Sequence, residues 1–350
     1  MTSPVASRRT SDFQYDYPPE AIAQRPLDER TASRLLVVDR VTGGLQHRLI
    51  RDLPSMIDPG DVVVVNSSRV IPARLTGARE NGREAEVLLI HPEPDGAWLA
   101  MVHPGGKLKV GRTVRFGDDA VATVVEILRG GVRRLRFEGP MQPRTLMDHY
   151  GRTPLPPYID RLPDAADIER YQTVFAKEEG SIAAPTAGLH FTHDLLETIE
   201  ARGAAITNVV LHVGPGTFKP VDAERLDDHV MQAEWYDVSE RTAETINQAK
   251  ADGHTVWAIG TTTVRTLEAA SAQSSPARVN AGSGWTDLFI YESFTFTIVD
   301  AMVTNFHLPR STLLMLVAAF GGYEPMMNAY RQAVNQGYRL YSYGDAMAIV

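Results

Sequence analysis

The sequence predicts an α/β protein that is interrupted by a small antiparallel β-barrel. Over residues 12–73 and 150–350, apolar strand-like runs alternate with segments of helical period, which indicates a mixed or largely parallel sheet. Over residues 74–149, short apolar runs are separated by glycine turns without a helical period, which is typical of a small barrel. We therefore predict a discontinuous α/β catalytic domain (12–73 plus 150–350), an inserted barrel domain (74–149) and a disordered polar tail (1–11).

The N-terminal part of the α/β domain begins with a short strand at residues 35–39 and a short helix at 52–57. Residues 62–65 are an unbroken run of valines, which predicts a strand buried on both faces. This strand leads directly into the polar loop 66–69. The expected barrel strands cover residues 86–91, 98–103, 113–116, 122–128 and 132–138.

The C-terminal part alternates strands and helices after a proline-rich linker near residue 155. We expect strands at 181–184, 207–213, 255–259, 288–290, 294–299 and 338–343. Expected helices cover 191–202, 240–251 and 264–271, and two more begin near residues 311 and 325.

The amino-acid composition excludes several classes of protein. The chain of 350 residues contains no cysteine, which excludes disulfides and thiolate chemistry. Its net charge of −8 argues against a broadly basic nucleic-acid binder, but residues 74–144 carry 12 Lys and Arg against 9 Asp and Glu. No apolar signal segment opens the chain, and no run approaches the ~18–20 apolar residues of a membrane span. We expect a cytoplasmic protein without a membrane segment.

The stretch 299–317 indicates a strand, a polar crossing and then a helix that Ser311 or Thr312 caps. A helix N-terminus favours a carboxylate or phosphate, and His307 in the crossing titrates near neutral pH. The alternative is an ordinary capped helix with an inert His307.

Five polar loops follow apolar strands in this way: 66–69, 185–190, 212–217, 260–265 and 304–312. If they converge on one face, they form a pocket lined by hydroxyls, N–H groups and imidazoles. The glycines at 214 and 216 lack the spacing of ATP or dinucleotide motifs. His190 and His193 lack accompanying cysteines and spaced carboxylates, so we expect no metal site.

These loops also carry a family resemblance. Long motifs in order, among them Asn66-Ser-Ser-Arg, Ala184-Pro-Thr-Ala-Gly-Leu-His, Gly260-Thr-Thr-Thr-Val-Arg and Asn305-Phe-His-Leu-Pro-Arg-Ser-Thr, resemble the S-adenosylmethionine:tRNA ribosyltransferase-isomerase family of queuosine biosynthesis. The resemblance runs from about residue 12 to the C-terminus, with the barrel matched by position. The chain departs from the family pattern at Glu292-Ser293, where Pro-Gly is usual, and at Gln232, where His is usual.

The resemblance implies a reaction. The ribosyl part of S-adenosylmethionine is transferred to the aminomethyl group of 7-aminomethyl-7-deazaguanine at the tRNA wobble position and isomerised, giving epoxyqueuosine, adenine and methionine. S-adenosylmethionine is then a ribosyl-donating co-substrate, tRNA is the partner, no metal is needed and a monomer is expected. The sulfonium supplies the reactivity.

On this interpretation, His190 and His307 are the candidates for proton transfer, and Arg69 and Arg265 are candidates for anion contact. The remaining candidates for binding S-adenosylmethionine are Asn66, Thr186, Gly188, Thr217, Thr261, Thr262, Asn305, Ser311, Thr312 and Asp345. Candidates for tRNA phosphate contact on the barrel are Lys107, Lys109, Arg112, Arg129, Arg133, Arg134 and Arg136.

Two alternatives come from other classes. A non-catalytic RNA-binding protein would need an aromatic platform, yet the barrel segment offers mainly Trp98, Phe116 and Phe137. A methyltransferase would have a glycine-rich loop after its first strand and an acidic residue after its second, and the first strand here is followed by neither. Release of adenine rather than S-adenosylhomocysteine distinguishes ribosyl transfer from methylation.

Overall fold

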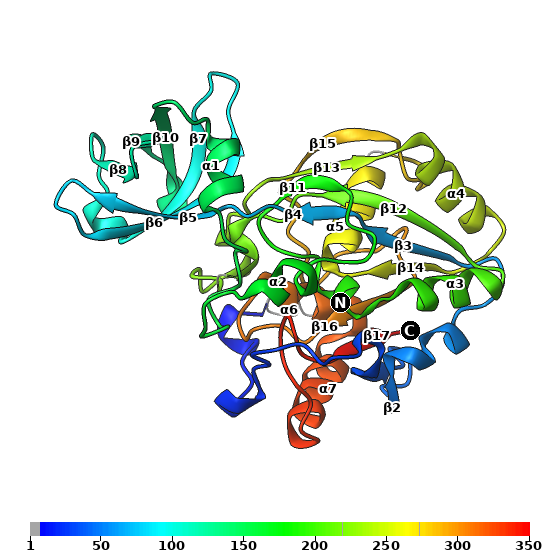
Figure 1. Cartoon of the computed structure of the whole chain (residues 1–350). Helices are drawn as coiled ribbons and strands as arrows, with labels where there is room; N and C mark the ends of the chain where they lie inside the picture. Colours follow the sequence, from blue (N-terminus) through cyan, green and yellow to red (C-terminus); the bar gives the residue numbers. More distant parts are fainter. Residues whose placement is uncertain (1–7, 219, 273) are drawn as a thin grey trace.

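A nine-stranded mixed sheet and a closed six-stranded barrel make up the framework of the protein (Figure 1). The computed structural model describes residues 8–218, 220–272 and 274–350. The order of strands in the sheet is β15-β13-β12-β3-β14-β16-β17-β1-β2, and the barrel order is β10-β7-β6-β5-β8-β9. The predicted fold class is therefore confirmed.

An interior strand of the sheet, β3 (Val62–Asn66), lies between β12 and β14, and all five of its residues are buried, as the valine run predicts. It runs parallel to β12 (Ala205–Leu211) and to β14 (Val256–Ile259), which in turn is parallel to β16 (Ala301–Asn305). The carboxyl ends of these four strands therefore lie at one edge. The remaining strands are β1 (Arg34–Val38), β2 (Leu45–Leu49), β13 (Glu234–Val238), β15 (Gly282–Thr286) and β17 (Ala346–Ile349).

Helices cover both faces of the sheet because successive side chains of β3 point in opposite directions. Val62 and Val64 pack on one face and Val63 and Val65 on the other, in two separate apolar clusters. The first cluster includes residues of α4 (Glu240–Ala251), α5 (Thr261–Ser271), α6 (Thr312–Gly321) and α7 (Tyr323–Asn335). The second includes residues of α3 (His193–Ala201) and of a 3₁₀ helix at Ile50–Met56.

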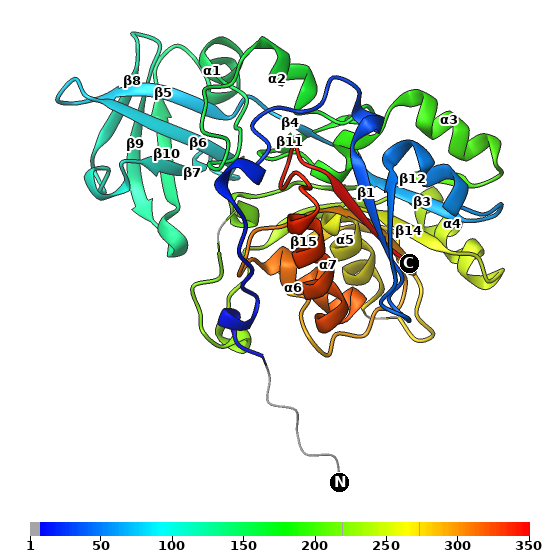
Figure 2. The same ribbon diagram turned by 90° about the horizontal axis from the view of Figure 1, so that it is seen from below.

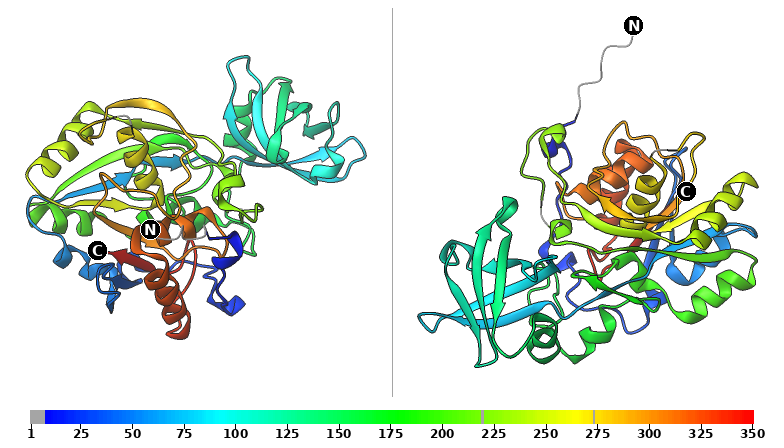
Figure 3. Two further views of the ribbon diagram at one scale, coloured as in Figure 1. Left: turned by 180° about the vertical axis from the view of Figure 1, so that it is seen from behind. Right: turned by 90° about the horizontal axis from the view of Figure 1, so that it is seen from above.

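The barrel projects from one side of the main body (Figures 2 and 3). Its strands are β5 (Arg74–Arg79), β6 (Glu84–Pro92), β7 (Trp98–His103), β8 (Thr113–Phe116), β9 (Ala120–Ile127) and β10 (Arg133–Glu138). Leu146 and Met147 of α1 (Pro143–Tyr150) complete its core. For this reason we propose that the inserted domain spans residues 74–149 and includes α1.

Short elements connect the two bodies. β4 (Ser68–Val70) pairs with β11 (Glu178–Ser181), which begins three residues before the strand expected at 181–184. A short helix, α2 (Ala165–Arg170), follows the proline-rich linker. The ordered chain begins within the stretch predicted as a tail, because Thr10 is buried and donates its N–H to Glu224 O at 3.0 Å. Residues 1–7 of that predicted tail lie outside the described residues.

Three expected strands are wrong, at 288–290, 294–299 and 338–343. In the second, the N–H groups of Thr297, Ile298 and Val299 donate to the buried carboxylate of Glu268 at 3.0–3.1 Å, so they are not available to a sheet partner. In the third, Tyr341 adopts φ +68, which breaks an extended strand. The sequence analysis also missed β2, β13, β15 and β17 as separate strands.

The turn at Glu292-Ser293 leads to a stability prediction. Phe294 N donates to Tyr291 O at 3.0 Å and Ser293 has φ +76, the geometry of a type II turn that favours the Pro-Gly expected from the family pattern. A non-glycine residue in this conformation costs roughly 1–2 kcal/mol, partly offset by the higher unfolded-state entropy of glycine. We expect Ser293→Gly to raise the free energy of unfolding by about 0.5–1 kcal/mol in urea denaturation.

The matched control is Ser55→Gly, which changes an exposed serine inside the 3₁₀ helix at Ile50–Met56. Ser55 is not among the positive-φ residues, so this change is expected to lower stability. Equal changes in the free energy of unfolding for the two substitutions would contradict the prediction that the backbone at Ser293 is strained.

Candidate active site

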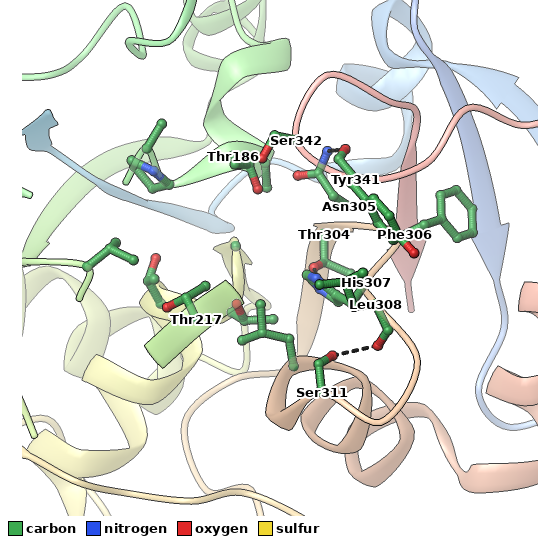
Figure 4. Close-up of a pocket in the computed structure, with 18 of the residues that line it drawn as sticks. Thr186, Thr217, Thr304, Asn305, Phe306, His307, Leu308, Ser311, Tyr341 and Ser342 are labelled. Carbon is green, nitrogen blue, oxygen red and sulfur yellow. Dashed lines mark hydrogen bonds between the residues drawn. The ribbon is translucent and has the colours of Figure 1, made fainter. Parts of the chain in front are cut away.

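A polar cavity lies where the carboxyl ends of β14 and β16 meet the loops after β12 and before α3, the position at which α/β sheets bind ligands. It holds about 590 Å³, counting its open mouth. Four of the five loops singled out in the sequence supply its wall, namely 185–190, 212–217, 260–265 and 304–312. Figure 4 shows Thr186, Thr217 and Ser311 around the common space from three different loops.

Two helix N-termini converge on this cavity. α5 begins at Thr261 and α6 at Thr312, and Thr261, Thr262, Ser311 and Leu313 all line the wall. Ser311 caps α6, since its Oγ accepts from Leu314 N at 3.2 Å and donates to Leu308 O at 2.7 Å (Figure 4). The positive ends of both helix dipoles therefore favour an anionic group in the cavity.

His307 lies in the cavity wall, and one nitrogen of its imidazole is hydrogen-bonded to Thr304. Its Nε2 is 2.7 Å from Thr304 Oγ1, its backbone N donates to Tyr330 Oη at 3.1 Å, and its carbonyl accepts from Tyr15 Oη at 2.5 Å. The residue is only 8% exposed, and burial lowers its pKa to about 3. The ring is thus neutral at physiological pH, and a neutral imidazole is the form that accepts a proton.

His190 lies behind the wall and contacts the cavity through Asn305. The amide Nδ2 of Asn305 donates to Tyr341 O at 3.1 Å and lies 3.1 Å from His190 Nε2. Burial, together with the charges of Arg30 and Arg339, lowers the pKa of His190 to about 3, so its Nε2 can accept this bond. Both amide hydrogens are used, and Oδ1 of Asn305 is buried without a hydrogen-bond partner among the described residues.

Several residues line the cavity that were not proposed as site residues from the sequence, among them the polar residues Tyr158, Thr304, Tyr341 and Ser342. Tyr158 and Ser342 line the cavity, and their hydroxyl oxygens lie 2.5 Å apart. Tyr158 comes from the proline-rich linker, where neither hydrophobic period nor polar loop marks it. Ser342 follows Tyr341, whose positive φ turns the chain toward the cavity.

Three charged candidates lie outside the cavity wall. Arg69 is exposed on β4 and lines a different surface cleft. Arg265 is buried on α5, where it forms an ion pair with Glu234 and donates to Leu288 O. Asp345 accepts the backbone N–H groups of Arg34 and Arg339 at 2.9 and 2.8 Å, so its carboxylate organises the chain before β17.

Three uncharged candidates also lie outside the wall. Asn66 is buried beneath it and donates to Leu211 O at 3.0 Å and Thr262 Oγ1 at 3.2 Å. Gly188 packs so tightly that a Cβ would lie 2.6 Å from the Phe175 ring. Thr312 is buried at the start of α6, and its Oγ1 has no partner among the described residues.

The barrel cations also differ from expectation. Arg133 is 7% exposed, and its guanidinium donates to the carbonyls of Leu108, Gly105 and Gly131, so it is unavailable to a partner. Arg134 is paired with Glu93 and Asp95. Lys107, Lys109, Arg112, Arg129 and Arg136 are exposed.

The described residues contain no group of three or more His, Asp or Glu side chains suited to a metal ion. His193 is exposed at the start of α3. Among the helices in the described ranges, none combines the length and the apolar character that crossing a membrane requires.

The fold and the cavity define an α/β protein with a barrel insertion and a polar cavity at its strand ends, the position at which proteins of this fold class bind small ligands. A family model described as "Queuosine biosynthesis protein" matches residues 10–349. The chain belongs to this queuosine biosynthesis family.

Named relatives cover almost the whole chain. The S-adenosylmethionine:tRNA ribosyltransferase-isomerase of Heliobacterium modesticaldum is 49% identical over 340 residues, covering 97% of this chain and 98% of its own. That of Moorella thermoacetica is 50% identical over 347 residues, covering 98% of this chain and 100% of its own. The crystal structure of S-adenosylmethionine tRNA ribosyltransferase from Thermotoga maritima superposes with a TM-score of 0.56 and 38% identity, covering 97% of this chain and 100% of that chain.

Proposed function

We propose that the protein transfers the ribosyl moiety of S-adenosylmethionine to the aminomethyl group of 7-aminomethyl-7-deazaguanine at the tRNA wobble position. The ribosyl group is isomerised in the same reaction, giving epoxyqueuosine and releasing adenine and methionine. The observation that carries the proposal is one cavity that combines two helix N-termini with a neutral, buried imidazole. The near full-length relatives that bear this activity in their names support it.

The polar wall suits the parts of S-adenosylmethionine. The methionine carboxylate binds at the N-terminal ends of α5 and α6. These helix ends replace the arginines that were expected from the sequence to bind it. In this proposal the hydroxyls of Thr186, Thr217 and Thr261, which line the cavity, bind the ribose. Asn305 Oδ1 needs a donor, and the N–H groups of adenine and of the ligand's ammonium group supply one.

The two histidines have different roles in this proposal. His307 accepts the proton from the carbon next to the sulfonium, since its ring is neutral and lines the cavity. A bound carboxylate raises the pKa of a neighbouring imidazole and so opposes the effect of burial. His190 is a positioning residue, because it reaches the cavity only through the Asn305 amide.

The products of the reaction test the proposal. The protein is incubated with S-adenosylmethionine labelled in adenine and with tRNA that carries the 7-aminomethyl-7-deazaguanine precursor, and the released bases are separated. We expect free adenine with precursor tRNA and none with tRNA that carries guanine at the wobble position. Release of S-adenosylhomocysteine would instead indicate methyl transfer, and no release from either tRNA would contradict the proposal.

The proposed tRNA substrate bears on the cellular location and the oligomeric state of the protein. We further propose that the protein acts in the cytoplasm, where tRNA is modified, and that it acts as a monomer. Light scattering of the protein alone and with tRNA tests the second point.

A further inference from the structure

A second cleft separates the barrel from the main sheet and adjoins the cavity. It encloses about 1240 Å³, open to solvent. Val213 lines both the cleft and the cavity, and the loop that follows borders both, with Gly214 and Pro215 in the cleft and Thr217 in the cavity. The cleft and the cavity therefore share the loop 213–217 as a common border.

Four aromatic rings form a row along this cleft. Trp235 of β13 and Trp285 of β15 are direct partners in an antiparallel pair, so their side chains lie on the same face of the sheet. The His212 ring stacks on Trp235, with ring centroids 5.0 Å apart and planes 22° apart. At the other end, His91 of the barrel lies against Trp285, with centroids 5.5 Å apart.

The row is accessible to solvent. Trp285 is 58% exposed, on the edge strand of the sheet, an unusual position for a large apolar side chain. Burial lowers the pKa of His212, which keeps its ring neutral. The sequence does not reveal this platform, since its members come from residues 91, 212, 235 and 285.

Cationic side chains border the row. Arg129 lines the cleft, is exposed and forms no ion pair among the described residues. Arg144 lines it as well and lies 3.4 Å from Glu179 in a solvent-exposed pair, which contributes little and can be exchanged for another anion. Aromatic faces next to guanidinium groups are the combination that binds single-stranded nucleic acid.

We propose that this cleft binds unpaired nucleotides of the anticodon loop next to the modified base, with at least one base stacked on Trp285 and the neighbouring phosphate at Arg129. The inference rests on the proposed function, because it takes tRNA as the substrate. A duplex does not expose base faces, so the cleft selects a loop. The adjoining cavity then receives the wobble base while its neighbours are held on the aromatic row.

The test is binding of a fluorescently labelled anticodon stem-loop to the full-length protein, measured by anisotropy over a range of salt concentrations. We expect Trp285→Ala to weaken binding about 5- to 100-fold without changing the salt dependence, and Trp285→Phe to retain most of the affinity. Arg129→Ala is expected to lower the slope of log affinity against log salt by about one. Val110→Ala is the control, because Val110 is an exposed apolar barrel residue outside the cleft.

A second measurement distinguishes the loss of a base-stacking contact from a non-specific effect of Trp285→Ala on the protein. Stem-loops with an abasic nucleotide at each position beside the wobble base are bound to wild type and to Trp285→Ala. At one of these positions, the loss of binding free energy caused by the abasic site and the loss caused by Trp285→Ala should not be additive, because both changes remove the same stacking contact. Additive losses at every position, or unchanged affinity of Trp285→Ala, would overturn the proposal.

Three further outcomes can be distinguished. If the wild type releases adenine with precursor tRNA while Trp285→Ala binds as well as wild type, the cleft proposal fails and the proposed function stands. If the wild type neither binds the stem-loop nor releases adenine, the proposed function fails and this inference with it. A dimer that Trp285→Ala dissociates would assign the cleft to a second copy of the chain and also overturn the proposal.

Discussion

His307→Ala is expected to lower kcat for adenine release by about 10² to 10⁴, the range for lost general acid–base catalysis. The physical reason is that His307 combines a neutral ring with a position on the cavity wall. Binding of tRNA is expected to change little, since the residue lies in the cavity and not in the cleft. The measurement is single-turnover adenine release at saturating tRNA and S-adenosylmethionine.

His193→Ala is the matched control, because His193 is exposed at the start of α3 and absent from the wall. Thermal unfolding of both variants shows whether a lower rate reflects loss of folding. Since burial lowers the pKa of His307 to about 3 in the free protein, protonation of this base should not lower kcat/KM near pH 6.5. If His307→Ala keeps a near wild-type rate, the residue is structural, and a direct role for His190 has to be tested next.

Glu234→Ala is expected to lower the free energy of unfolding by about 3–5 kcal/mol, because it leaves the buried Arg265 guanidinium without its counter-ion. Both side chains are nearly inaccessible, and Glu234 Oε1 also accepts from Gly214 N at 2.7 Å. The substitution therefore removes an ion pair and releases the loop that borders both the cavity and the cleft. Urea denaturation gives the change in stability.

The double substitution Glu234→Leu/Arg265→Met is the control, since replacing both ions by apolar groups removes the unpaired charge. We expect it to be more stable than Glu234→Ala, yet to bind the stem-loop more weakly than wild type because Gly214 N loses its acceptor. An exposed pair such as Arg112 and Glu80 should cost at most about 1 kcal/mol when broken. A loss from Glu234→Ala no larger than this would show that solvent reaches the guanidinium.

Local patterns were sufficient for much of the framework. The valine run at 62–65 indicated a strand buried on both faces, and β3 lies in the interior of the sheet between β12 and β14. The loss of helical period after residue 74 identified the barrel, because alternation and glycine turns are properties of neighbouring residues. The strands expected at 294–299 and 338–343 failed because a remote carboxylate, Glu268, and a positive φ at Tyr341 override local propensity.

The candidate site, like the framework, was predicted in part from the sequence and in part only from the tertiary structure. Sequence alone determined which loops carry polar groups. The parallel topology of β3, β12, β14 and β16 then brings the loops after these strands to one edge of the sheet, whereas the loop 185–190 follows β11, which pairs with β4 outside that sheet. Only the tertiary structure decided which side chains face the cavity. Arg265 faces Glu234 and Arg133 faces three carbonyls, whereas Tyr158 turns inward from a linker and Trp285 stays outside. The physical reason is that a motif fixes the residue types, but burial, ion pairing and ring contacts depend on partners remote in the chain.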